Sequence, residues 1–296
     1  GRIFDRFRNR IMFPINDGAG RPIAFSGRSF GSARGSEAKY INSPDTLLYD
    51  KSRVLYLFDR AKFALRRAER CILVEGQFDA LLSHQAGIIE TVAVSGTALS
   101  ANHLELIHRL TGKLIMAFDG DAAGIKASSR AITLGLERGF EVRVAVLPAG
   151  QDPAEVIRES KPAWEKTLAQ TSHVIDFLVE TIKRRGSDRR ELAHQIEREV
   201  YPYLAALANP IDQAYFVRGV AELTDLPETV IRDGVGRAKV SRVSEATEKV
   251  APSSVSPPMP TRRSRLEELI FGFMVWRGET DRTLKSMVGK HWGEDF

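Results

Sequence analysis

Apolar and polar positions alternate in regular blocks through the middle of the chain. Four short apolar runs predict β-strands at residues 71–74, 91–94, 113–118 and 141–147. The segments between them have helical spacing and predict helices at 78–86, 100–110, 122–138 and 153–160. Glycines at 87, 112 and 139 stand where these helices are expected to end. Such alternation with short connections predicts right-handed crossovers, and hence a compact α/β domain with a mostly parallel sheet at residues 69–160.

The segments on either side of this domain have other patterns. Short β-like runs predict a mixed basic subdomain at residues 1–68, in which 31–38 is a loop by composition. Helical periodicity alone continues through residues 161–239, which predicts a helical subdomain. Residues 240–263 are rich in Ser, Pro, Lys and Arg and predict a flexible linker. A capping box at 264–267 opens an incomplete helical domain at 264–296. The expected fold class is therefore α/β plus all-α, in a fragment of a longer polypeptide.

Composition excludes only a few kinds of site and partner. The 296 residues carry 43 Lys and Arg against 38 Asp and Glu, and this mild excess permits a polyanionic partner without requiring one. The single cysteine, Cys71, excludes an intramolecular disulfide and a multi-cysteine zinc site within this chain. It lies in an apolar run and is expected to be a buried thiol. No stretch is apolar and long enough to span a membrane, and a cytoplasmic location without a membrane partner is expected.

Carboxylates follow three of the predicted strands. Glu75 comes directly after the first strand and Asp79 one turn later; Asp119 and Asp121 follow the third strand, and Asp152 the fourth. The carboxyl ends of parallel strands meet at one edge of a sheet, so these side chains are expected to gather there. Gathered carboxylates repel one another unless they hold a hard cation such as Mg²⁺. A single Asp can equally be a helix N-cap, but the whole set favours metal binding, and Glu is a poor N-cap.

Two of these motifs resemble the Toprim domain, which is shared by bacterial primases, type IA and type II topoisomerases and some nucleases. They are the segments 74–79 (VEGQFD) and 118–124 (FDGDAAG). The resemblance implies that Glu75 serves in acid–base or metal chemistry and that Asp119 and Asp121 bind Mg²⁺ or Mn²⁺. The catalytic residues implied are Glu75, Asp119 and Asp121. Supporting positions implied by the motifs, including the Gly-Thr step of the primase form, are Gly76, Asp79, Gly96 and Thr97.

The third acidic motif departs from the family pattern. The family commonly has Asp-Pro-Asp, whereas Asp152-Pro153-Ala154-Glu155 has alanine at the third position. Asp152 remains available as a metal ligand, while Glu155 is one position out of register. The number of metal ions bound is therefore left open.

Four segments in the first sixty residues resemble bacterial (DnaG-like) primases. They are residues 6–15, 20–28, 39–44 and 48–56, in matching order apart from a small insertion at 31–38, so that the resemblance covers residues 1–160. It implies synthesis of RNA primers on single-stranded DNA from ribonucleoside triphosphates by nucleotidyl transfer. If Arg6, Arg8 and Arg10 lie on one strand, they share a face and form a basic strip for phosphates. The implied nucleotide and DNA contacts are Arg6, Arg8, Arg28, Lys39, Asn42 and Lys51.

Three other functions fit the sequence less well than a primase. A topoisomerase needs a tyrosine nucleophile, and none of the six tyrosines has a recognisable context for one. A Toprim nuclease uses the same metals with water as nucleophile, but such nucleases do not resemble residues 1–60. A non-catalytic helicase-binding or DNA-binding module does not account for the acidic set. The primase resemblance further implies a replicative helicase partner through the C-terminal region, zinc only in an N-terminal domain outside this chain, a monomer, and work at the replication fork.

Overall fold

The computed structural model describes residues 5–30, 38–118, 122–148, 150–186 and 188–248, without the side chains of 118, 122–127 and 241–248. The chain forms two compact units, Gly1–Ser244 and Glu245–Phe296.

The first part of the chain forms a small antiparallel sheet of order β1-β2-β3. Its strands are β1 (Arg10–Asn16), β2 (Pro22–Ser29) and β3 (Tyr40–Asn42). A single 3-10 turn, η1 (Lys51–Arg53), and the helix α1 (Phe58–Ala68) lead from it into the second sheet. The backbone of Tyr56, in the segment that connects the two sheets, bridges to Ala93 of the second sheet.

The second sheet has five strands in the order β5-β4-β6-β7-β8. They are β4 (Cys71–Val74), β5 (Thr91–Ala93), β6 (Lys113–Phe118), β7 (Glu141–Val146) and β8 (Ser172–His173). All neighbours pair in parallel except β7 and β8. The helices that alternate with the strands are α2 (Gln77–Gln85), α3 (Ala101–His108), α4 (Ala122–Glu137) and α5 (Pro153–Glu159). The predicted α/β alternation is confirmed, with bounds that differ by one or two residues.

The apolar strand runs are explained by burial on both faces of the sheet. In β4, Cys71 and Leu73 face one core cluster, whereas Ile72 and Val74 face the other. Side chains of successive strand residues point to opposite faces, so a strand covered on both sides needs a continuous apolar run. Cys71 is a fully buried free thiol, as predicted, and burial raises its pKa.

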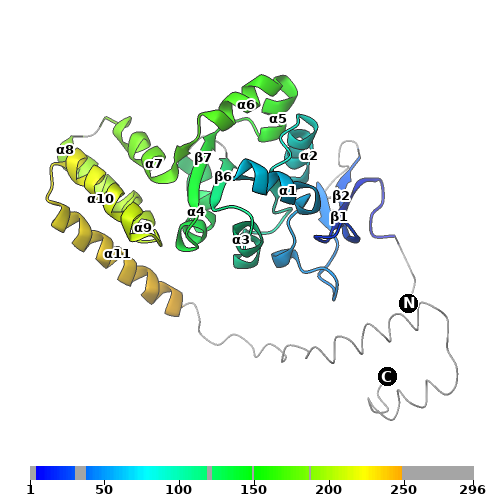
Figure 1. The fold of residues 1–296 in the computed structure, drawn as a ribbon, viewed down its shortest axis with the longest axis horizontal. Helices are drawn as coiled ribbons and strands as arrows, with labels where there is room; N and C mark the ends of the chain where they lie inside the picture. Colours follow the sequence, from blue (N-terminus) through cyan, green and yellow to red (C-terminus); the bar gives the residue numbers. More distant parts are fainter. Residues whose placement is uncertain (1–4, 31–37, 119–121, 149, 187, 249–296) are drawn as a thin grey trace, which may run out of the picture. The chain divides into compact units, whose positions relative to one another are not determined.

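The remaining helices are α6 (Lys161–Ala169), α7 (Val174–Lys183), α8 (Arg189–Glu199), α9 (Tyr201–Leu204), α10 (Pro210–Thr224) and α11 (Glu228–Glu248). Of these, α6 lies beside α5, whereas α7 to α11 gather beside the five-stranded sheet, away from the three-stranded sheet (Figure 1). The prediction of helical structure alone after residue 160 was wrong at β8, whose two residues are too few for a periodic signal. The helix α11 also continues to Glu248, into the segment predicted as linker from residue 240.

The predicted basic strip was wrong in its geometry. The strand β1 begins at Arg10, so Arg6 and Arg8 precede it and do not alternate along a strand. Asn9 has a left-handed backbone (φ 49°), which interrupts any extension of the strand. Within the described part of the chain, no helix combines the length and the apolar character needed to cross a membrane.

Candidate active site

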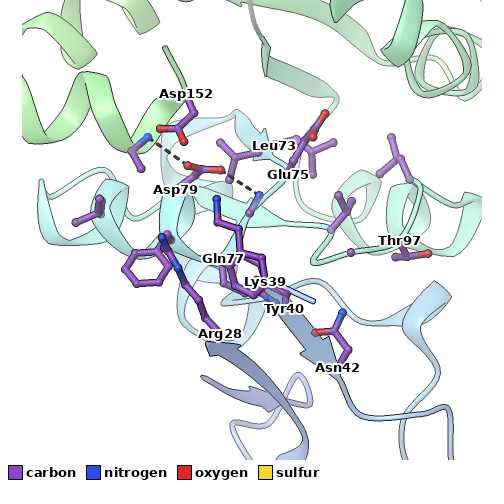
Figure 2. A pocket seen from close by; sticks show the side chains of 18 of the residues that line it. Arg28, Lys39, Tyr40, Asn42, Leu73, Glu75, Gln77, Asp79, Thr97 and Asp152 are labelled. Atoms are coloured by element: carbon purple, nitrogen blue, oxygen red, sulfur yellow. Dashed lines mark hydrogen bonds between the residues drawn. The ribbon is translucent and has the colours of Figure 1, made fainter. Parts of the chain in front are cut away.

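A cavity of about 1500 Å³ lies between the small sheet and the carboxyl edge of the large one. Residues of β2 and β3 line one wall, and residues that follow β4 and β5 line the other. Among the predicted site residues, those that line it are Arg28, Lys39, Asn42, Glu75, Gly76, Asp79, Gly96, Thr97 and Asp152. Residues far apart in the sequence therefore meet at one site, with the carboxylates above and the cationic groups below in Figure 2.

The acidic wall is built from the ends of strands and the starts of helices. Glu75 directly follows β4 and its side chain is exposed. Asp79 lies in the first turn of α2 and accepts hydrogen bonds from the backbone N–H groups of Gly76 (3.1 Å) and Ala154 (3.2 Å), drawn in Figure 2. Asp152 is the N-cap of α5 and accepts from the N–H of Glu155 at 2.8 Å. Asp79 thus links the two segments that carry the other carboxylates.

The pKa of Asp79 reflects the burial and the negative charge of this wall. Burial of Asp79 and, next in size, the negative charge of Asp152 raise this pKa to about 6, and Glu75 adds to the effect. A raised carboxyl pKa means that the ionised form is penalised by low dielectric and by like charge. The wall therefore gathers negative charge, and a bound cation would relieve the repulsion.

The basic wall is organised by aromatic rings. The guanidinium of Arg28 lies 4.4 Å from the ring centroid of Phe78 and 5.7 Å from that of Tyr40, a cation–π arrangement. Phe78 belongs to α2 of the opposite wall and also packs edge-on against Phe13 of β1, with centroids 5.3 Å apart. Burial raises the pKa of Tyr40, although the charge of Arg28 opposes this. Arg28 is thereby held at the seam between the two walls.

A second contact between the walls depends on glycine. The side-chain amide of Asn42 donates to the backbone carbonyl of Ser95 at 3.3 Å. Ser95 and Gly96 both have left-handed backbones, with φ of 53° and 79°. A Cβ on Gly96 would lie 2.7 Å from Nδ2 of Asn42, closer than atoms can approach. Only glycine allows the loop after β5 to approach Asn42 in this way.

Three predicted contacts lie elsewhere. The described lining of the cavity does not include Arg6, Arg8 or Lys51. Arg6 reaches the carbonyl of Asn42 at 3.4 Å, and Arg8 is exposed. The ammonium of Lys51 lies 4.0 Å from the carboxylate of Asp45. Two groups that line the cavity were not foreseen, Arg130 of α4 and Arg158 of α5, because a cationic side chain on an exposed helix face has no distinctive sequence signal.

Only two of the four predicted metal ligands, Glu75 and Asp152, lie within the described residues. Asp119 and Asp121 lie outside the residues that the structure describes. In the described ranges, no three His, Cys, Asp or Glu side chains come close enough to hold a metal ion. The carboxylate of Glu155 accepts from the N–H of Asp152 at 3.2 Å, completing the capping box of α5. Glu155 therefore has a structural role, separate from the missing third acid of the motif.

Comparison with known proteins identifies the family. Residues 1–62 match the model of the DNA primase catalytic core, N-terminal domain, and residues 72–157 match the Toprim-like model. The chain resembles the crystal structure of a DNA primase domain from Pseudomonas aeruginosa, with 30% identity and a TM-score of 0.66 over 79% of this chain and 73% of that one. The chain belongs to the DNA primase family. A structure of the DnaG primase catalytic domain bound to ssDNA is also similar, with 30% identity, a TM-score of 0.67 and coverage of 76% and 72%.

Curated DNA primases are longer than this chain. The DNA primase of Deinococcus radiodurans is 31% identical over 296 residues, which cover 95% of this chain and 51% of the relative. The DNA primase of Listeria monocytogenes is 47% identical over 163 residues, or 55% of this chain and 26% of the relative. The chain thus spans about half or less of the length of these primases.

Proposed function

We propose that this primase-family chain synthesises short RNA primers on single-stranded DNA by metal-dependent nucleotidyl transfer. The observation that supports this most directly is the two-walled cavity, with Glu75, Asp79 and Asp152 on one wall and Arg28 and Lys39 on the other. Carboxylates suit a divalent cation, and cationic side chains suit phosphates, so the arrangement fits a metal-assisted reaction at a phosphate group. Nucleotidyl transfer is such a reaction.

The residues present fit a divalent metal ion. The ligands we assign are Glu75, Asp119, Asp121 and Asp152, all oxygen donors that Mg²⁺ and Mn²⁺ accept. Burial and, next, the neighbouring charge of Asp152 raise the pKa of Asp79, and a cation bound nearby would favour its ionised form. The bound metal would neutralise charge on the reacting phosphate and the leaving group. Asp79 itself, with both its oxygens bonded to backbone N–H groups, would hold the ligand-bearing segments at a fixed separation.

The basic wall would bind the phosphates and the template. Arg28 can contact a phosphate with two parallel N–H donors, while Lys39 acts as a point charge. Asn42, fixed by Ser95, offers a polar group beside them. With the nucleoside triphosphate held here, the primer 3′-hydroxyl attacks the α-phosphate, the bond to the β-phosphate breaks, and pyrophosphate leaves. Glu75 would complete the metal site or assist transfer of the hydroxyl proton.

Other features belong to the same proposal. The division into segments 1–68, 69–160, 161–239, 240–263 and 264–296 is retained as a hypothesis, except that α11 reaches Glu248. A replicative helicase contact through the C-terminal segment, a monomeric state and action at the replication fork are retained likewise. The segment 264–296 lies outside the described residues.

The test is primer synthesis by the purified chain on single-stranded DNA, with labelled ribonucleoside triphosphates and Mg²⁺ or Mn²⁺. Short products that require both template and metal, and that disappear with a chelator, are expected. Glu75→Gln should abolish them, whereas Glu105→Gln, at an exposed carboxylate paired with Arg109, should not. Metal-dependent cleavage of the template in place of synthesis would identify a nuclease instead.

A further inference from the structure

The turn η1 is tied to the start of α3 by hydrogen bonds between segments about fifty residues apart. The Nε2 atom of His103 lies 2.8 Å from the carbonyl oxygen of Lys51. The hydroxyl of Ser100 donates to the carbonyl of Ser52, and the amide of Asn102 lies 3.5 Å from the hydroxyl of Ser52. The backbone of η1 is therefore clamped onto the helix that follows β5.

His103 occupies the centre of this clamp and uses both ring nitrogens. Its side chain is fully buried. Nδ1 accepts from the backbone N–H of Ser100 at 3.3 Å, so Nε2 carries the proton and donates to Lys51. The neutral imidazole satisfies both partners, and burial lowers the pKa of His103 in agreement with that form.

Lys51 is fixed at its backbone by two hydrogen bonds, and its charged end makes one long ion pair. Its N–H donates to the carboxylate of Asp45 at 3.0 Å, and its carbonyl accepts from His103 at 2.8 Å. Its ammonium, by contrast, is 4.0 Å from the nearest carboxylate oxygen, at the limit of an ion pair. A fixed backbone limits the positions that the ammonium of Lys51 can reach, as a residue that binds an anionic ligand requires.

The clamp also connects η1 to the wall of the cavity. The loop that leads into α3, from Gly96 to Leu99, lines the cavity directly. The same loop follows Ser95, whose carbonyl holds Asn42. One stretch of chain, residues 95–103, therefore fixes both Asn42 and Lys51 of the preceding subdomain.

We propose that His103 is a positioning residue that sets where the Lys51 ammonium reaches for a phosphate group. This inference rests on the proposed function, and on the nucleotide or template contact that the primase resemblance implies for Lys51. The phosphate can belong to the nucleoside triphosphate or to the template backbone, and the chemistry is the same in both cases. His103 acts only through Lys51, so removing its hydrogen bond matters only while Lys51 is present.

Two substitutions separate the two bonds of His103. His103→Asn keeps an acceptor near the position of Nδ1 for the Ser100 N–H but cannot reach the Lys51 carbonyl. His103→Gln places an amide donor near the position of Nε2, and Gln is also a normal capping-box residue three positions after Ser. The matched control is His84→Asn, because Nε2 of His84 also lies 2.8 Å from a backbone carbonyl, that of Thr91.

The experiment measures equilibrium binding to the full chain, in separate arms for ATP with Mg²⁺ and for a labelled single-stranded oligonucleotide. Each substitution is made alone and together with Lys51→Ala, and thermal melting checks that every variant is folded. Lys51→Ala should weaken binding in at least one arm by about tenfold, the size of one charge-assisted hydrogen bond. In that arm, His103→Asn should weaken binding by roughly three- to tenfold alone but less than about twofold on top of Lys51→Ala. His103→Gln should bind like the unmodified chain.

Equal effects of His103→Asn with and without Lys51→Ala would overturn the inference, as would the same non-additivity for His84→Asn. If Lys51→Ala changes neither arm, the inference is also wrong, while primer synthesis by the unmodified chain would still uphold the proposed function. Absence of primer synthesis together with the expected non-additive binding would uphold the inference about His103 and contradict the proposed function. The two hypotheses can thus fail separately.

Discussion

The helical region and the cavity region use the same charged residue types in opposite ways. Along α7 to α11, arginines lie beside carboxylates at the surface. The pairs are Arg185 with Glu199 (2.7 Å), Arg189 with Asp225 (2.8 Å), Arg218 with Glu222 (2.9 Å) and Arg232 with Glu228 (3.0 Å). At the cavity, Asp79 is instead influenced by Asp152 and Glu75, and Arg28 lies over aromatic rings.

This difference distinguishes surface charges that are paired with opposite charges from cavity charges that a bound ligand would balance. Exposed ion pairs contribute little to stability, and their loss is tolerated. Carboxylates held near one another destabilise the fold unless a ligand offsets the repulsion, so their presence indicates a function. The following predictions test the contrast, beginning with the largest expected effect.

Removing a carboxylate that we assign to the metal ion should have the greatest effect on activity. Asp119→Asn and Glu75→Gln are each expected to reduce primer synthesis by more than about a hundredfold, because charge stabilisation at the reacting phosphate is lost. Both variants should melt within a few degrees of the unmodified chain. Synthesis retained by Asp119→Asn would refute the metal assignment.

Removing a cation from the basic wall should weaken binding while leaving the chemistry intact. Arg28→Ala is expected to lower affinity for single-stranded DNA or nucleotide by about tenfold and to reduce the salt dependence of DNA binding by roughly one phosphate contact. Titrations at several salt concentrations measure both quantities. Arg218→Ala, in the helical region, is the control, and an equal effect there would mean that binding is non-specific.

The helical region should make the stability of the protein depend on pH in the acidic range. Burial lowers the pKa of His173 to about 4, and its ring stacks on Phe216 with centroids 4.5 Å apart. Since its unfolded pKa is near 6.5, stability is fully present above that pH and is lost as the pH falls toward 4. The loss should be about 2–3 kcal/mol. His173→Asn keeps the N-cap acceptor and should flatten the denaturation midpoint across this pH range; an unchanged pH profile would contradict the assignment.

The smallest effect is expected for the surface pairs. Arg232→Ala removes the contact with Glu228 and should change the free energy of unfolding by less than about 0.5 kcal/mol, without altering primer synthesis. Urea denaturation measures the first quantity. A loss of unfolding free energy above about 2 kcal/mol would show that the surface pair contributes as much as a buried one. That result would contradict the contrast between the two regions.

The sequence predicted the large sheet well because strands buried on both faces leave a continuous apolar run, as in β4. It also brought Glu75, Asp79 and Asp152 to one edge, since parallel strands end together. It could not predict that Asn9 adopts a left-handed backbone and ends the run of alternating arginines. Nor could it show that Arg28 lies over Phe78, because this contact depends on how two separately folded sheets meet.

The two regions share a single core, which has a mechanical consequence. One cluster of buried side chains runs from Leu73 and Met116 of the sheet through Ile175 and Leu204 to Ile231 of the last helix. Bending between the helices and the sheet would open that core, so the helices give a rigid backing to the sheet whose edge we assign to metal binding. A protease that cuts between α6 and α7 should therefore release no stable fragment, and the helices could not be exchanged for others without redesign of the sheet face that they cover.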